Sequence, residues 1–221
     1  MRFFLKNLQM MLQPKVLTVV CVCFITSVLY NGPRFPETLC GIRGGFELLS
    51  AVSWTALIFP YFFATGAFFA SMEDAAVFAL PRSGNIRHYI VICGLCLLTF
   101  SVSYCLLGAL AAVLCGGELA EALLCAALLT VNLLFLAIVQ GTVYAANKNL
   151  GLSIGIVLGI LILALLFPHL PVNPGAWGML TRSRFRHKLG FPILPVLGAE
   201  TVLTLLGLIL TVQIQKKKLI L

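Results

Sequence analysis

Charged side chains are scarce in this chain. Only 10% of its 221 residues are Asp, Glu, Lys or Arg, whereas 61% are hydrophobic. Soluble domains are about one quarter charged and about half apolar. The composition therefore excludes a water-soluble globule and an intrinsically disordered chain, and it indicates a protein embedded in a membrane.

The sequence also lacks the short motifs that hold nucleotides and catalytic metals. It contains no G-x-x-x-x-G-K-[ST] loop, no H-E-x-x-H pair and no His and Asp cluster with metal-ligand spacing. We therefore expect no catalytic residues, no metal site and no cofactor in this chain. Its apolar runs also lack paired acids and a Ser and His couple, which disfavours an intramembrane hydrolase.

Cysteine is present, but its placement argues against a disulfide framework. Seven of the eight cysteines lie in or at the ends of apolar runs, where they are expected to pack as small core residues. Cys93 and Cys96 have C-x-x-C spacing without the second ligand pair of a zinc site. Cys40 falls in a predicted loop, and a bridge from it to Cys115 is the pairing left open.

The long apolar runs predict six membrane spans, because a spanning helix needs about 20 apolar residues. We expect an all-α polytopic membrane protein with an N-terminal amphipathic interfacial helix over residues 1–14 and one six-helix transmembrane domain over 15–221. A signal peptide competes for the first run, but no A-x-A pattern follows Tyr30. The predicted spans are residues 16–30, 50–71, 89–115, 119–145, 150–167 and 196–212.

The distribution of Lys and Arg predicts the orientation. With both termini in the cytoplasm, nine basic residues face the cytoplasm and six face the exterior. We therefore expect a multi-pass protein of the bacterial plasma (inner) membrane with cytoplasmic termini. The bilayer also accounts for the formal charge of +8, so the charge does not indicate a nucleic-acid partner.

Few polar groups fall within the spans. Glu200, Asn132 and Gln140 are the candidates for a transport pathway or a gate. In the competing interpretation Asn132 and Gln140 form hydrogen bonds between helices, and Glu200 faces the basic loop of residues 168–195 at the membrane interface. That loop, which holds Trp177, Arg182, Arg184 and Arg186, is expected to face solvent and lipid headgroups.

Two further features concern the shape of the spans. Pro60 should kink the second span because proline removes one backbone donor. Three glycines at intervals of four residues in the fifth span should allow close helix packing, within one subunit or between two: Gly151, Gly155 and Gly159.

The segment from Met72 to His88 carries the most informative pattern. Two acids begin a short apolar stretch that Pro81 closes, and basic residues follow before the third span. Because a helix dipole favours acids at its start, this segment predicts a structured cytoplasmic helix on which a partner can act. A second role for its arginines is to anchor the third span at anionic headgroups. The residues concerned are Glu73, Asp74, Leu80, Pro81, Arg82, Ser83 and Arg87.

This segment, together with the basic leader, the six spans and the lysine-rich tail, resembles the permease subunits of bacterial ABC-2 type exporters. The resemblance implies a short helix that docks on separate ABC ATPase subunits, which would bind the ATP and Mg. It implies a second permease, identical or a sister chain, contact with membrane lipid, and outward movement of a hydrophobic or amphipathic drug, peptide antibiotic or lipid-like substrate. The alternative is the substrate-capture subunit of a vitamin importer, but the first span lacks the A-x-x-x-A face expected there.

Overall fold

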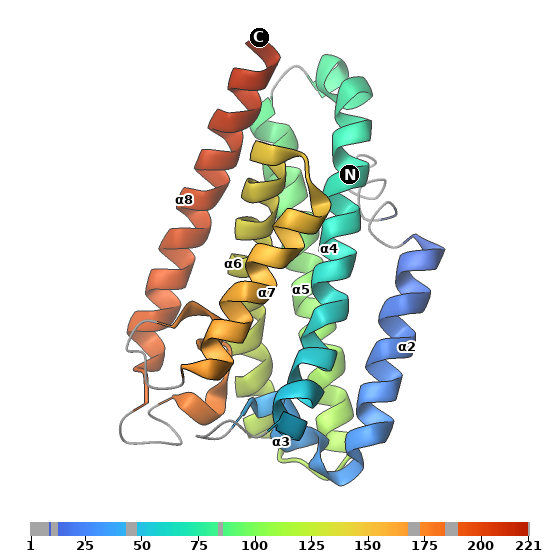
Figure 1. Cartoon of the computed structure of the whole chain (residues 1–221), viewed down its shortest axis with the longest axis vertical. Coiled ribbons are helices and arrows are strands. Elements are labelled where there is room, and N and C mark those ends of the chain that lie inside the picture. Colours follow the sequence, from blue (N-terminus) through green and yellow to red (C-terminus); the bar gives the residue numbers. More distant parts are fainter. Residues whose placement is uncertain are drawn as a thin grey trace.

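The structure, a computed structural model, describes residues 9, 13–42, 48–83, 86–167, 173–183 and 190–220, the side chains of 73–83, 86–89 and 215–220 excepted. Within these residues the fold is a bundle of long helices with no strand (Figure 1). The predicted all-α polytopic fold is thus confirmed. The amphipathic helix predicted over residues 1–14 falls almost wholly outside the described residues.

Each predicted span corresponds to one helix, but only the fifth agrees with its helix to within one residue at both ends. Among the described residues, five segments are long and apolar enough to cross a bilayer, and α7 is a shorter apolar helix. Short 3-10 turns and the six-residue helix α3 lie between them. The elements are α2 (Pro14–Asn31), η1 (Gly32–Arg34), α3 (Phe35–Cys40), α4 (Leu48–Ser83), α5 (Ile86–Leu114), α6 (Leu119–Asn147), α7 (Leu150–Leu166), η2 (Pro174–Ala176), η3 (Leu180–Arg182) and α8 (Ile193–Ile220).

The second span continues into the segment that was expected to form a separate short helix. α4 runs for 36 residues without interruption, through both Pro60 and Pro81. At 1.5 Å per residue it is about 54 Å long, much longer than the roughly 30 Å of hydrocarbon. The expected cytoplasmic loop is therefore the end of α4 and the beginning of α5, because nothing in the sequence before Gly84 stops the helix.

The helix α6 forms the centre of the bundle and packs against α4, α5, α7 and α8. Between α4 and α5 lies an aromatic cluster, in which Tyr61 stacks on Phe100 with ring centroids 5.5 Å apart. The Tyr61 hydroxyl lies 2.7 Å from Ser101 Oγ, and the Tyr104 hydroxyl of the same cluster donates to the Leu57 carbonyl, so both polar groups are paired. Packing of aromatic rings thus fixes α4 on α5 at the core.

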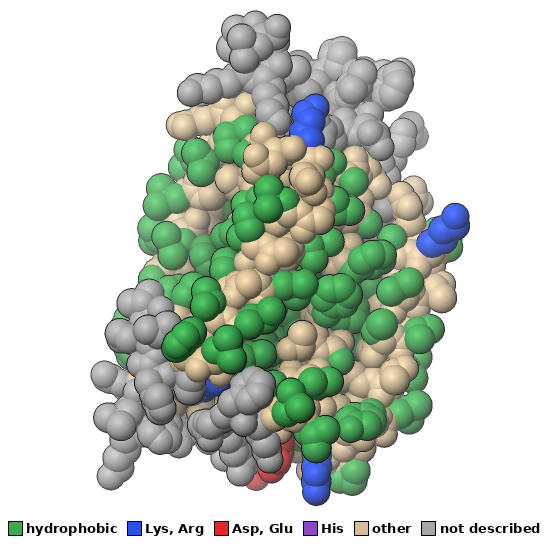
Figure 2. All heavy atoms as spheres, viewed as in Figure 1, with side chains coloured by type: hydrophobic (Ala, Val, Ile, Leu, Met, Phe, Trp, Pro, Cys, Tyr) green, Lys and Arg blue, Asp and Glu red, His purple; other side chains and the backbone are tan. Residues whose placement is uncertain are grey.

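The outer surfaces of the helices are apolar. α2 and α8 lie on opposite sides of the bundle (Figure 1). Only 17% and 11% of the residues in their most apolar stretches are buried within the chain. Figure 2 shows hydrophobic side chains spread over the visible flank, with few charged groups among the described ones. Such a surface is that of a protein whose flank faces lipid rather than water.

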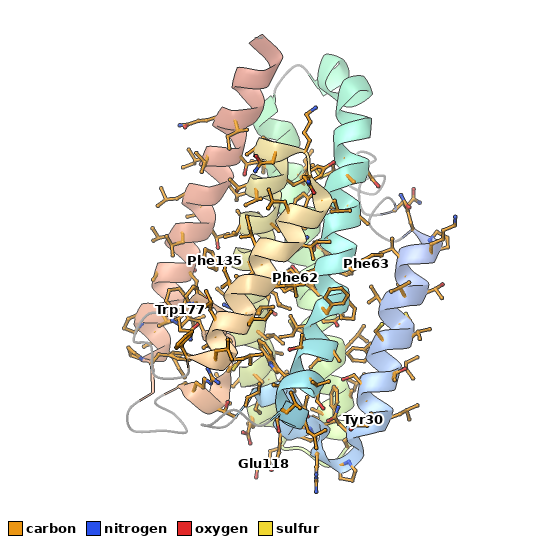
Figure 3. The ribbon with its side chains drawn as sticks, in the orientation of Figure 1. Tyr30, Phe62, Phe63, Glu118, Phe135 and Trp177 are labelled. Atoms are coloured by element: carbon orange, nitrogen blue, oxygen red, sulfur yellow. The ribbon has the colours of Figure 1, made fainter. Side chains whose placement is uncertain are left out.

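One end of the bundle, here called the α3 end, is covered by α3 and by the turn between α5 and α6. Glu118 and Tyr30 lie at this end in Figure 3.

Cys40 is the last residue of α3 and is buried, not in a loop as predicted. Gly41 follows with φ of 98°, and a Cβ there would lie 2.6 Å from Met179 Cβ, so glycine is required by conformation and by space.

Candidate functional site

A buried hydrogen bond joins α6 to α8 inside the apolar bundle. Asn132 Nδ2 donates to Glu200 Oε1 at 2.6 Å, and the two residues are 1% and 0% exposed. The other carboxyl oxygen of Glu200 and the side-chain oxygen of Asn132 are buried without a hydrogen-bond partner among the described residues. Both oxygens are hydrogen-bond acceptors, so each can accept a hydrogen bond from a further donor.

The segment of residues 173–183, here called the plug, covers this pair. The Asn132 amide also donates to the Pro174 carbonyl at 2.7 Å. A Cβ on Gly178 would lie 2.8 Å from Asn132 Oδ1, so the plug backbone rests directly on the asparagine. Asn132 is 13 residues after Leu119, about 20 Å along α6, and the plug therefore reaches deep into the bundle.

The plug is packed rather than solvated, which corrects the expectation for this part of the loop. Trp177 is 8% exposed, and Met179 and Leu180 are fully buried. Trp177 lies toward α8 in the half of the bundle that contains the α3 end (Figure 3). Irregular backbone is stable at membrane depth only where protein covers it, and these side chains provide that cover.

Arg182 fastens the plug to the two neighbouring elements. Its guanidinium donates to the Ala164 carbonyl at the end of α7 and, from Nε at 3.4 Å, to the Ile42 carbonyl. Burial removes water from the guanidinium and so lowers the pKa of Arg182. The expected pairing of Glu200 with Arg182 is therefore absent: the arginine bonds to backbone carbonyls and the acid to Asn132. Arg184 and Arg186 lie outside the described residues.

Gln140 forms a second buried contact, between α6 and α4. Its Oε1 accepts from Thr65 Oγ1 at 2.7 Å, and its Nε2 donates to the Phe62 carbonyl at 3.0 Å. Gln140 follows Asn132 by eight residues, about 12 Å along the helix, so it does not join the Glu200 pair. Its contacts are those of the interhelical hydrogen-bond partner that the competing interpretation described.

The glycine stripe of α7 faces away from the neighbouring helices. A Cβ at Gly155 or Gly159 would meet nothing within 4 Å among the described residues, and one at Gly151 would meet only Asn149, the residue that caps α7. The stripe therefore supports no close helix packing within the described chain. Packing between two chains stays a prediction.

The opposite end of the molecule, here called the α4–α5 end, carries the predicted coupling residues. Six of these residues belong by their backbone to α4 and one, Arg87, belongs to α5; the structure does not describe their side chains. The six in α4 are Glu73, Asp74, Leu80, Pro81, Arg82 and Ser83. In Figure 1 the ends of α4, α5 and α8 project beyond the turn that joins α6 to α7. Gln13 Nε2 donates to Ser71 Oγ at 3.2 Å, which fixes the start of α2 to this part of α4.

Comparison with family models, curated proteins and solved structures gives no match. Among the described residues no group of three His, Cys, Asp or Glu side chains is placed to hold a metal ion. The assignment of function therefore depends on the geometry of the two ends of the bundle.

Sequence reasoning found Asn132 and Glu200 separately but missed their pairing and the plug that covers them. The signal for the plug was the apolar run Gly175 to Leu180 within a loop otherwise rich in basic residues. Gly175 also lies against α7, where a Cβ would be 2.7 Å from the Ile160 carbonyl oxygen. Apolar residues and closely spaced glycines in a loop between two spans thus indicate a segment that folds back into the bundle.

Proposed function

We propose that this chain is the membrane-spanning permease subunit of an ATP-driven exporter of the ABC type. Separate ATPase subunits bind and hydrolyse ATP, and the permease pairs with an identical or sister chain to move a hydrophobic or amphipathic substrate outward. The observation that carries the proposal is the unbroken course of α4 from Leu48 to Ser83. It gives the bundle a helical extension on which a partner can push.

A continuous helix transmits displacement better than a loop does, because its backbone hydrogen bonds keep its length fixed. α4 contacts α6 through Thr65 and Gln140, and Tyr61 of α4 donates to the Leu133 carbonyl of α6 at 3.4 Å. Asn132, adjacent to Leu133, holds both Glu200 and the plug. Contiguous contacts thus connect the extension to the covered site, as coupling between distant sites requires.

The proposed orientation places the α4–α5 end in the cytoplasm of a bacterial plasma membrane. The C-terminal end of α8 lies at this end (Figure 1), and its last two turns contain Lys216, Lys217 and Lys218. Lysines at the cytoplasmic end of a span agree with the positive-inside rule. The α3 end and the plug then face the exterior, where substrate leaves.

The proposal is tested by co-expressing the chain with an ABC ATPase from the same source and purifying the complex through a tag on the permease. Arg82→Glu with Arg87→Glu should lower ATPase recovery about tenfold, the change that ~1.4 kcal/mol of binding free energy produces. Reversing these charges opposes any acidic partner surface while leaving the apolar spans unchanged. ATPase recovery and phosphate release in proteoliposomes are the two measurements.

The matched control is Arg34→Glu, which reverses an exposed charge in η1 at the opposite end. It should leave ATPase recovery unchanged. Equal recovery with the double variant and the wild-type chain would count against docking at the α4–α5 end. Substrate turnover by the purified chain without an ATPase would exclude the permease proposal altogether.

A further inference from the structure

The thiols of Cys40 and Cys125 lie unusually close together at the α3 end. Their Sγ atoms are 2.8 Å apart, although the structure holds both residues as thiols. Two non-bonded carbon atoms at their best separation are about 3.5–4.0 Å apart, and sulfur is larger than carbon. A disulfide bond needs about 2.0 Å, so a movement of less than about 1 Å brings the pair to bonding distance.

A carboxylate stands beside the pair. Cys40 Sγ donates to Glu121 Oε1 at 3.6 Å, and Glu121 lies one turn before Cys125 on α6. A thiol attacks a disulfide only as its thiolate, and Glu121 is placed to accept the proton that Cys40 must lose. Cys40 is 7% exposed and Cys125 is fully buried, so the reaction begins at Cys40.

We infer that Cys40 and Cys125 are a site of disulfide formation that fastens α3 to α6. The oxidant is a small disulfide, RS–SR. The Cys40 thiolate attacks one sulfur of the oxidant, giving a mixed disulfide and releasing one RSH. The Cys125 thiol then loses its proton and attacks the Cys40 sulfur, which forms the Cys40–Cys125 bond and releases the second RSH.

The bond has a structural consequence that does not depend on the proposed function. It closes the chain from residue 40 to residue 125, which contains all of α4 and α5, and long closed loops restrict the unfolded chain most. α3 would then stay fixed against α6 at the α3 end. In the cell such bonds persist on the exterior side of the plasma membrane, which is where the proposed orientation places this end.

The test uses the purified full-length chain in detergent, with dipyridyl disulfide as oxidant and iodoacetamide to tag the remaining thiols. Trypsin cuts after Arg34 and Arg43, so Cys40 is released in the peptide of residues 35–43. In the wild-type chain this peptide should lose its tag completely and appear linked to the peptide of α6 until a reductant is added. A tagged peptide 35–43 after oxidation would overturn the inference.

Variants identify the partner. Cys125→Ser should abolish the link and leave peptide 35–43 as its mixed disulfide with one half of the oxidant, with Cys125→Ala as a second variant that suits the apolar position. Cys115→Ser is the matched control, because Cys115 lies at the same end and is half-buried; it should leave the link intact. Loss of the link in Cys115→Ser and its survival in both Cys125 variants would overturn the assignment in favour of the pairing open from sequence. The detergent assay requires no ATPase, so its outcome is separate from that of the permease proposal.

Discussion

At the scale of single residues, the Asn132 side chain connects three parts of the structure: α6, α8 and the plug. One amide nitrogen serves the carboxyl of Glu200 and the carbonyl of Pro174, and so joins two elements to α6. A buried polar group that loses its partner costs more free energy than the hydrogen bond contributed. Asn132 therefore stabilises α8 and the plug together.

Asn132→Leu should lower the stability of the chain by about 3 kcal/mol, because Glu200 is left buried without its donor. This corresponds to a fall of roughly 10 °C in the midpoint of thermal unfolding for a domain of this size. Glu200→Gln keeps an acceptor for the asparagine and should change the midpoint little. The measurement is thermal unfolding in detergent, followed by size-exclusion chromatography.

A second substitution shows whether the unpaired carboxyl causes the loss. Adding Glu200→Leu to Asn132→Leu should recover about 2 kcal/mol, since replacing both members of a buried polar pair by apolar groups is often nearly neutral. Thr201→Ala on the exposed face of α8 serves as control. Equal unfolding midpoints for the single and double variants would contradict the role assigned to this hydrogen bond.

The residue scale also marks the limit of sequence reasoning. Asn132, Gln140 and Glu200 were found because polar groups in apolar runs are rare. Their partners were not, since pairing depends on how the helices rotate against one another. The sequence favours a loop at Cys40 because Gly and Pro surround it, whereas the structure forms the short helix α3 there, with Pro36 in its first turn and Gly41 directly after it.

At the scale of elements, two helical glycines have different surroundings. A Cβ at Gly141 of α6 would lie 2.6 Å from the ring of Phe69, whereas one at Gly155 of α7 would meet nothing within 4 Å among the described residues. Close approach of helices therefore occurs at α6 and α4. The regular spacing of the glycines in α7 therefore did not identify where helices approach closely.

Gly141→Leu should destabilise the chain by about 2 kcal/mol, because the added side chain overlaps Phe69. Gly155→Leu should leave the folded chain intact or stabilise it by up to about 1 kcal/mol, since leucine favours helix more than glycine does. Unfolding midpoints of the two variants in detergent make the comparison. A large fall in the unfolding midpoint of monomeric Gly155→Leu would show that α7 makes a helix contact that the described residues lack. If the variant instead keeps its midpoint but no longer forms a dimer, the second permease binds to α7.

The course of α4 shows why element boundaries were harder to predict than element existence. The apolar run ends near Ser71, and acids and Pro81 follow, so the sequence favoured a break at the membrane surface. α4 nevertheless continues, because Glu, Asp, Ala and Phe in the next turns do not terminate a helix, and neither proline interrupts it. Hydropathy marks where the lipid ends rather than where the helix ends.

At the scale of the whole molecule, the two ends of the bundle have different roles in the proposed cycle. The α4–α5 end receives force from the ATPase, and the α3 end covers the Glu200 pair with the plug. If the extension acts as a rigid lever, its stiffness matters separately from its affinity for the ATPase. The two properties can be altered independently.

Ala75→Gly with Ala76→Gly should weaken the helix of the extension by about 2 kcal/mol in total while keeping its charges. We expect ATPase recovery to stay near that of the wild-type complex. Addition of a non-hydrolysable ATP analogue should then no longer speed hydrogen exchange in the plug, as it should in the wild-type complex. Hydrogen–deuterium exchange of the plug peptide measures this.

The matched control carries the same two changes on exposed helix faces remote from the extension, Ala120→Gly and Ala199→Gly. It should respond to the ATP analogue as the wild-type complex does. An unchanged response in the Ala75 and Ala76 variant would mean that force does not travel along α4.

In the proposed permease, the plug also bears on the kind of movement that would open the bundle. α7 has only 17 residues, about 26 Å, and the irregular plug occupies the depth that further helical turns would fill. In the proposed permease, the buried side chains of Trp177, Met179 and Leu180, instead of a complete helix, would insulate the membrane electrically at this place. Withdrawal of this one short loop would then open a passage with every span kept as a helix.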